Sequence, residues 1–112
     1  MSETQTHWVE VCSLEQLSPN TGVCALIQGK QVAIFWDKRN QALYALDNYC
    51  PFSQCNSLSR GIIGETQGQP YVASPLYKQR FHLETGQCLD DEDTRIAIYP
   101  IKQHDGGVHI AI

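Results

Sequence analysis

The sequence has no apolar run near the roughly 18 consecutive residues that a transmembrane helix needs. Residues 1–10 contain neither a basic head nor an apolar stretch, so we expect no secretory signal. Eight lysines and arginines stand against twelve acidic residues, and the net charge of −4 argues against binding to nucleic acid or anionic lipid. These absences favour a cytoplasmic protein with no nucleic-acid and no membrane partner.

Cysteines are also too few for a disulfide scaffold, and their number is odd, so they cannot all pair within the chain. The chain has five cysteines, which in a protein without a secretory signal are typical of reduced thiols. Cys12 and Cys24 occur within strand-like patterns, and we expect both in the core. Cys50, Cys55 and Cys88 remain as candidates for metal binding.

Apolar residues are present in sufficient number for a compact fold. Leu, Ile, Val and Phe together account for 27 of the 112 residues, which is above the level typical of disordered chains. We find no internal repeat, linker or low-complexity segment. The sequence therefore predicts a single domain over residues 1–112.

Short runs with β-strand character, separated by turn residues, dominate both ends of the chain. Gly29-Lys30 and Asp105-Gly106 are hairpin signals, and Ser13 with Gln16 resembles a capping box on one helical turn. We predict an all-β protein, an antiparallel sandwich or barrel, with scaffold strands at about 6–46 and 94–112. The runs that carry this prediction are 7–12, 22–28, 31–36, 42–46, 95–102 and 108–112.

The middle of the chain, at about 47–93, has a different composition. It holds four of the eight glycines, three of the five prolines and three of the five cysteines. We interpret it as a subdomain of loops carried on the β scaffold, which is where functional sites tend to occur.

The order of motifs in this middle segment resembles a known iron–sulfur family. The motifs are Cys50-Pro51-Phe52, Leu58-Ser59-Arg60-Gly61, Ser74-Pro75-Leu76-Tyr77, Phe81-His82-Leu83 and Thr85-Gly86-Gln87-Cys88-Leu89. They resemble the Rieske domain, in which two loops each supply one Cys and one His to a [2Fe–2S] cluster. The resemblance implies a Rieske-like fold with the loop subdomain at the cluster position.

The same comparison places non-ligands at most cluster positions. Cys50 is retained, but Phe52 stands at the first histidine position, Ser74 at the second cysteine position and Tyr77 at the second histidine position. Phe has no donor atom, and a Tyr hydroxyl with a pKa near 10 suits a soft iron–sulfur site poorly. We therefore expect no cluster, no metal and no catalytic residue in this chain.

Within the Rieske family, the chain resembles the small subunits of bacterial NADH-dependent assimilatory nitrite reductases over nearly its whole length. This resemblance implies a non-catalytic subunit that binds a large subunit carrying FAD, a [4Fe–4S] cluster and sirohaem. That enzyme reduces nitrite to ammonium by six electrons in nitrate assimilation.

Alternatives remain open at this stage. Cys50, Cys55, Cys88 and His82 could hold an unusual [2Fe–2S] site in an electron-transfer ferredoxin, or another metal, although they offer only one loose ligand pair. A Cys–His hydrolase has no supporting local motif. The domain could also be an interaction module for another oxidoreductase.

Phe52, Leu76 and Tyr77 are the candidate partner-binding residues. Exposed aromatic side chains are enriched at protein interfaces, and Phe52 alternatively fills the space that a cluster would occupy. We expect Tyr77→Ala to weaken binding to the large subunit more than it lowers the melting temperature. The acidic run at 90–93 is interpreted as a solvated loop.

Overall fold

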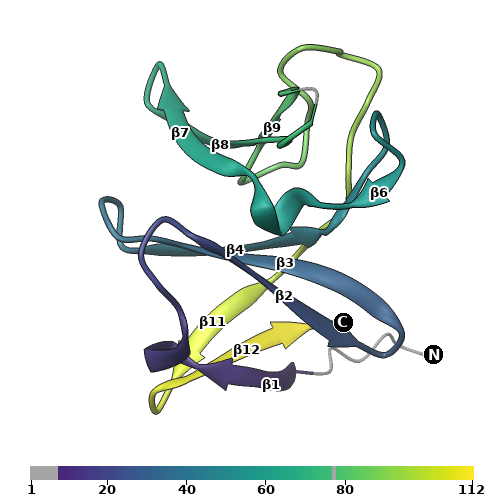
Figure 1. The fold of residues 1–112 in the computed structure, drawn as a ribbon. Helices are drawn as coiled ribbons and strands as arrows, with labels where there is room; N and C mark the ends of the chain where they lie inside the picture. Colours follow the sequence, from purple (N-terminus) through teal and green to yellow (C-terminus); the bar gives the residue numbers. More distant parts are fainter. Residues whose placement is uncertain (1–7, 77) are drawn as a thin grey trace, which may run out of the picture.

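The computed structural model describes residues 8–76 and 78–112, and its strands pair in antiparallel sheets as predicted (Figure 1). One scaffold sheet contains three strands in the order β1 (Trp8–Ser13), β12 (Gly107–Ala111) and β11 (Ile101–His104). The other has the order β10 (Ile98–Tyr99), β4 (Ala42–Asp47), β3 (Lys30–Asp37) and β2 (Gly22–Ile27).

Two tight hairpin turns fix the register of these sheets. Gln28 and Gly29 connect β2 to β3 with φ values of 51° and 81°, and Asp105 and Gly106 connect β11 to β12 with 53° and 78°. Two successive positive φ values are the signature of the turn that matches strand twist. The Asp-Gly prediction is confirmed, whereas the first turn lies one residue earlier than predicted because Lys30 already begins β3.

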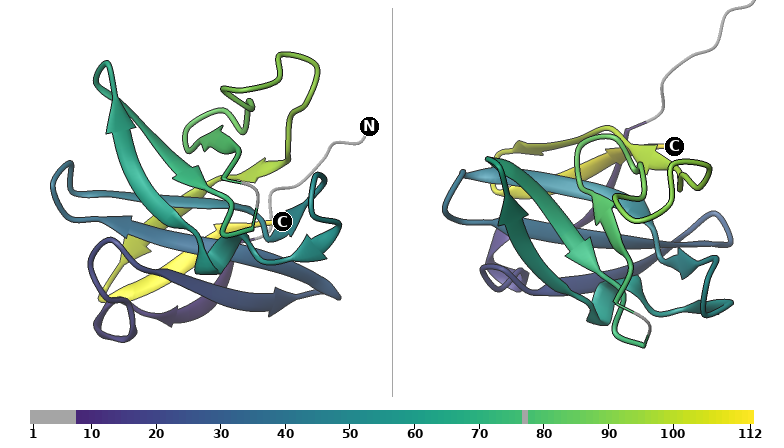
Figure 2. Two further views of the ribbon diagram at one scale, coloured as in Figure 1. Left: turned by 45° about the horizontal axis from the view of Figure 1, so that its top comes forward. Right: turned by 90° about the horizontal axis from the view of Figure 1, so that it is seen from above.

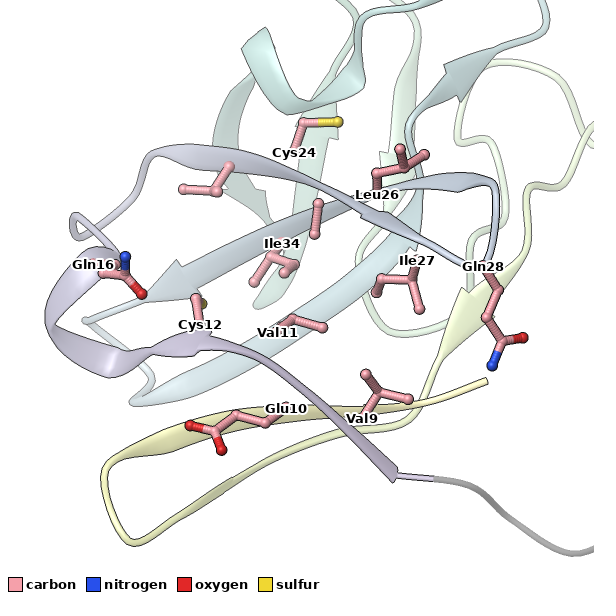
Figure 3. Close-up of a pocket in the computed structure, with 12 residues that line it drawn as sticks. Val9, Glu10, Val11, Cys12, Gln16, Cys24, Leu26, Ile27, Gln28 and Ile34 are labelled. Atoms are coloured by element: carbon pink, nitrogen blue, oxygen red, sulfur yellow. The ribbon is translucent and has the colours of Figure 1, made fainter.

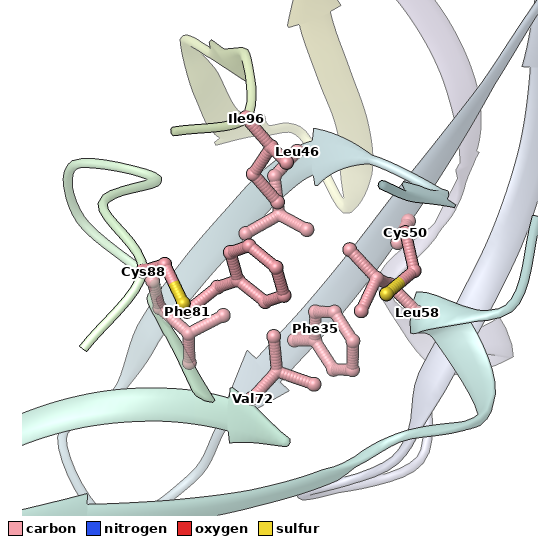
Figure 4. Close-up of a cluster of buried hydrophobic side chains, with 10 residues drawn as sticks. Phe35, Leu46, Cys50, Leu58, Val72, Phe81, Cys88 and Ile96 are labelled. Carbon is pink, nitrogen blue, oxygen red and sulfur yellow. The ribbon is translucent and has the colours of Figure 1, made fainter. Parts of the chain in front are cut away.

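Strand β3 separates two hydrophobic cores. Val32 and Ile34 face one way and Ala33 and Phe35 the other, since successive side chains of a strand point to opposite faces. The inter-sheet core lies between the two scaffold sheets and contains Leu17, Ile27, Val32, Ile34, Ala45, Val108 and Ile110. The subdomain core contains Ala33, Phe35, Leu46, Cys50, Leu58, Val72, Phe81, Leu83, Cys88 and Ile96 (Figure 4). The unbroken apolar run 32–35 is therefore typical of a strand covered on both faces.

The middle segment contains more strands than the sequence predicts. β5 (Tyr49–Cys50) pairs with β6 (Cys55–Asn56), and β7 (Ile62–Thr66), β8 (Gln69–Ala73) and β9 (Arg80–His82) form a three-stranded sheet above the scaffold (Figure 2). The prediction of a segment made of loops is thus wrong in part. Its glycine and proline content marked this segment as loop, yet Gly64 and Pro70 lie within strands.

A second correction concerns the predicted strand at 95–102. Regular pairing begins only at Ile98, and Pro100 divides the run into β10 and β11. Proline has no N–H to donate to a sheet, and here the chain leaves one scaffold sheet and enters the other.

The helical content of the described residues is small. A 3-10 turn, η1 (Leu14–Gln16), follows β1, and the Gln16 side chain accepts a hydrogen bond of 2.8 Å from the Ser13 amide, as the predicted capping box requires. A second turn, η2 (Leu58–Arg60), follows β6. In residues 8–76 and 78–112, no helix has the length and hydrophobicity to cross a membrane.

Candidate functional site

Cys50 and Ser74, which are 24 positions apart in the chain, meet in the subdomain core. Cys50 ends β5 and Ser74 follows β8, and both side chains are buried. The Cys50 thiol donates to the Ser74 hydroxyl over 3.4 Å from Sγ to Oγ. The two loops singled out in the sequence thus converge on one point beside the scaffold.

The remaining residues singled out in these loops are Phe52, Leu76 and Tyr77, and the structure describes the first two of them. Phe52 is half-buried against the subdomain core, and its ring centroid lies 6.1 Å from that of Phe81 at an interplanar angle of 45°. This contact is a favourable tilted aromatic pair. Leu76 is 61% exposed. Tyr77 lies outside the described residues, so the hypothesis that it binds the partner stays a prediction.

The donor set at this point does not fit a Rieske cluster. The sulfur and hydroxyl at the two cysteine positions contact each other directly, and the side chain at the first histidine position is an aromatic hydrocarbon. Among the described residues, no three His, Cys, Asp or Glu side chains come together in a group that could hold a metal ion. Iron held by two thiolates and two imidazoles requires donors that these positions lack.

The environment of Cys50 nevertheless favours its thiolate. Burial opposes ionisation, but hydrogen bonds from the side chains of Ser53 and Ser74 and from the amides of Phe52 and Ser53 outweigh it and lower the pKa of Cys50. Cys55 is the direct cross-strand partner of Cys50 in the β5–β6 hairpin. A hydrogen bond with Ser53, whose Oγ lies 3.3 Å from Cys55 Sγ, lowers the pKa of Cys55 as well.

Cys88 and His82, the other candidate ligands, are both buried in positions that favour a structural role. Cys88 is buried in the subdomain core, and this burial raises the pKa of its thiol. His82 is also buried, and its Nδ1 accepts a hydrogen bond of 3.2 Å from the Glu84 amide. A buried thiol with a raised pKa is a poor nucleophile, so this pair gives no support to a hydrolase.

Asn48 is a central residue of this region that sequence reasoning did not single out. It is only 2% exposed, and its amide nitrogen donates to Gln31 Oε1 over 3.0 Å and to Cys24 Sγ over 3.4 Å. Its Oδ1 accepts from the Ser59 amide over 2.6 Å. Asn48 therefore connects β2 and β3 of the scaffold to η2. The only signal in the sequence was a polar residue directly after a strand.

The same network explains why the expectation for Cys24 is wrong. Cys24 is exposed, not part of the core, because the edge strand β2 turns its sulfur away from the inter-sheet core toward Asn48 and Gln31. Cys12 is partly buried and packs against the inter-sheet core, in keeping with its prediction.

The acidic run at 90–93 is exposed in large part but is more ordered than a solvated loop requires. Arg80 donates from its backbone amide and guanidinium to the Asp90 carboxylate, with the shortest contact at 2.8 Å, and these bonds lower the pKa of Asp90. Asp91 accepts hydrogen bonds from the Asp93 amide and the Thr94 hydroxyl. The run thus stabilises its own turn.

A groove of about 660 Å³ lies away from this region, between β1 and β2 (Figure 3). Val9, Val11 and Ile27 contribute its apolar walls, and Glu10 and Cys12 lie on the β1 side. Burial, followed by the charge of Glu10, raises the pKa of Cys12. The Cys12 thiol of this groove is therefore not an activated nucleophile.

The all-β fold of the chain agrees with the folds of the proteins to which its sequence is similar. Residues 7–111 match the family described as the Rieske-like [2Fe-2S] domain. The nitrite reductase (NADH) small subunit of Salmonella typhimurium is 43% identical over 105 residues, which cover 94% of this chain and 97% of that protein. The NMR structure of the E. coli protein NirD has 41% identity and a TM-score of 0.88, covering 96% of this chain and 98% of that one.

A further similarity involves a much larger protein. The nitrite reductase [NAD(P)H] large subunit of Klebsiella oxytoca is 37% identical over 103 residues, which cover 92% of this chain and 11% of that protein. A segment similar to this chain therefore occurs within a polypeptide named as a large subunit.

Proposed function

The chain belongs to the Rieske-like [2Fe-2S] domain family and, within it, to the small subunits of NADH-dependent nitrite reductase, and from this membership we propose that it is the non-catalytic small subunit of such an enzyme. The observation that carries the proposal is similarity over 94% of the chain and 97% of the Salmonella subunit. The large share of both chains that is matched supports a common domain over the matched residues.

The Klebsiella large subunit supports the choice of partner. A segment similar to this chain and the remainder of that subunit belong to one polypeptide, so the two are held together covalently there. In our proposal, this chain reaches the same arrangement by binding a separate large subunit in the cytoplasm.

We place the redox chemistry in the partner. The contact between Cys50 and Ser74, together with the packing of Phe52 on Phe81, leaves no cluster-binding donor set in the described residues. FAD, the [4Fe–4S] cluster and sirohaem then belong to the large subunit, which passes electrons from NADH to nitrite. This chain contributes binding and ordering, with no cofactor and no catalytic residue of its own.

Phe52, Leu76 and Tyr77 are the proposed partner-binding residues. Leu76 is 61% exposed next to the buried Ser74, and an exposed leucine costs hydration free energy that an apolar partner surface recovers. Phe52 is anchored in the subdomain core and keeps part of its ring accessible. The two loops thus combine a ring packed on the subdomain core with an exposed apolar side chain.

Reconstitution with a purified nitrite reductase large subunit tests the proposal. We expect a complex of defined mass by size-exclusion chromatography with light scattering, and NADH-dependent nitrite reduction by that complex. Leu76→Ala is expected to weaken the complex at least tenfold. Leu26→Ala is the matched control, since Leu26 is 74% exposed on the scaffold strand β2. No complex with any cofactor-loaded large subunit would contradict the proposal and favour another oxidoreductase as the partner.

The visible spectrum of the purified chain tests the assignment of the cofactors. A protein prepared without oxygen is expected to be colourless and free of iron and acid-labile sulfide. About two irons and two sulfides per chain would instead identify an electron carrier.

A further inference from the structure

We propose that Cys50 and Cys55 form a reversible disulfide across the β5–β6 hairpin, so that the loop at the proposed partner-binding end of the molecule is a site of thiol oxidation. The two residues are directly opposite each other in the antiparallel pairing. Side chains of directly opposed residues lie on the same face of a ladder, and their Cα atoms are about 4.5–5.5 Å apart. Disulfides span Cα separations of about 4.4–6.8 Å.

The short loop between the two cysteines brings their sulfur atoms into a common environment. The Gln54 amide donates to the Cys50 carbonyl over 2.7 Å, which folds residues 51–54 back on β5. Ser53 lies inside this loop with its hydroxyl 3.3 Å from Cys55 Sγ, and hydrogen bonding to Ser53 acts on both thiols. The pKa of each thiol is lowered, which raises the fraction of the reactive thiolate.

The different exposure of the two sulfurs gives the reaction an order. Cys55 is partly exposed and Cys50 is fully buried, so Cys55 meets an oxidant first. With glutathione disulfide as oxidant, the Cys55 thiolate attacks one sulfur, breaks its S–S bond and releases one glutathione thiolate. The Cys50 thiolate then attacks the mixed disulfide at Cys55 and releases the second glutathione. One disulfide is consumed and one is formed, so two electrons pass from the protein to glutathione.

The other three cysteines do not share these features. Burial raises the pKa of both Cys12 and Cys88. Cys24 is exposed, but its cross-strand partner is Ala33, and the described contacts of its sulfur are to Gln31 and Asn48. Formation of a disulfide within the chain is therefore expected to be concentrated in the β5–β6 hairpin.

Mass spectrometry of the full chain after exposure to glutathione disulfide tests the proposal. Free thiols are blocked with N-ethylmaleimide before digestion with trypsin. Cleavage after Arg39 and Arg60 gives the peptide 40–60, which contains Cys50 and Cys55 and no other cysteine. We expect this peptide to lack two hydrogens and to carry no blocking group, and reduction with dithiothreitol to restore two blocked thiols.

Single variants separate the two steps of the reaction. Cys50→Ser is expected to stop at a glutathione adduct on Cys55, and Ser53→Ala to slow formation of the bridge severalfold. Cys24→Ser, which leaves the pair intact, is the matched control and is expected to oxidise like the wild type. Two blocked thiols in peptide 40–60 of the wild type, or a bridge between Cys12 and Cys24 in peptide 1–30, would overturn the proposal.

Discussion

The two cores on either side of β3 differ in what they contain. The buried members of the inter-sheet core are all aliphatic, and this core lies between two regular sheets. The subdomain core joins short strands and turns, and includes two aromatic rings and two thiols, with the polar side chains of Ser74 and His82 buried nearby. One core is thus held by packing of interchangeable apolar groups, whereas the other depends on particular residues.

The difference shows what holds together the segment that resembles the cluster-binding subdomain of Rieske proteins. In the positions where the Rieske pattern places iron ligands, this chain has a hydrogen bond between Cys50 and Ser74 and an aromatic contact of Phe52. Gly86 retains the turn that follows β9, since its φ is +81° and a Cβ there would lie 2.1 Å from the Ile96 carbonyl oxygen. Packing and backbone conformation thus both contribute to the geometry of this segment.

Removing one of the two buried phenylalanine rings of the subdomain core is the strongest test of this comparison. Phe35→Ala is expected to lower the free energy of unfolding by about 3–5 kcal/mol, because the ring is fully buried and its loss leaves a cavity. Urea denaturation followed by fluorescence measures the change. Ile34→Val, which removes one methyl group from the inter-sheet core, is the control and is expected to cost about 1 kcal/mol. Equal small effects would mean that the subdomain core contributes little to folding.

The connection between the two regions is tested at Asn48. Asn48→Ala is expected to cost about 1–3 kcal/mol, because it leaves the Ser59 amide without its acceptor and removes the amide donor to Gln31 Oε1. Thermal unfolding and hydrogen exchange of the η2 amides measure the loss. Asn56→Ala, at an exposed position of β6, should change neither. Unchanged exchange in Asn48→Ala would show that the Asn48 side chain does not hold η2 to the scaffold.

Tyr99 tests the attachment of β10 to β4 within the scaffold. Its hydroxyl donates to Asp47 Oδ1 over 2.6 Å, and burial together with this bond raises the pKa of Tyr99 to about 12. A raised pKa favours the neutral phenol in the folded state, so its contribution is complete below about pH 10 and is lost as the pH rises to about 12. Tyr99→Phe is expected to cost about 1–2 kcal/mol at pH 8.

The pH profile distinguishes this bond from a general effect of base. The difference in melting temperature between the wild type and Tyr99→Phe should shrink between pH 10 and pH 12. A constant difference across that range would contradict the role of the Tyr99 hydroxyl.

The ion pair of the subdomain is expected to have the smallest effect. Asp90→Asn should lower stability by no more than about 1 kcal/mol at pH 7, because both side chains of the Arg80–Asp90 pair are more than a third exposed. The bonds from Arg80 lower the pKa of Asp90, so the contribution is present above the ordinary carboxyl pKa and disappears as the pH falls below it. Guanidinium would screen the pair, so urea titrations at pH 7 and pH 3 are the measurement. Asp93→Asn, at an exposed position of the same run, should have no effect at either pH.

Local sequence is informative about part of this fold. The strands β2, β3 and β4 and the Asp105-Gly106 turn were predicted because alternation and turn residues act within a few positions. The three-stranded sheet β7–β8–β9 was missed, since its glycine and proline content resembles that of loops. Cys24 was misplaced because the burial of an edge-strand residue depends on what lies over it.

The sequence by itself determined the all-β class and the family resemblance. It also predicts a site with few iron ligands, because a phenyl ring lacks a donor atom in any fold. Only the tertiary structure decided that Cys50 contacts Ser74 and opposes Cys55, and that Asn48 connects the scaffold to η2. Those contacts depend on strand register and on the meeting of distant segments. A shift of one residue in register would turn each side chain to the opposite face of its strand.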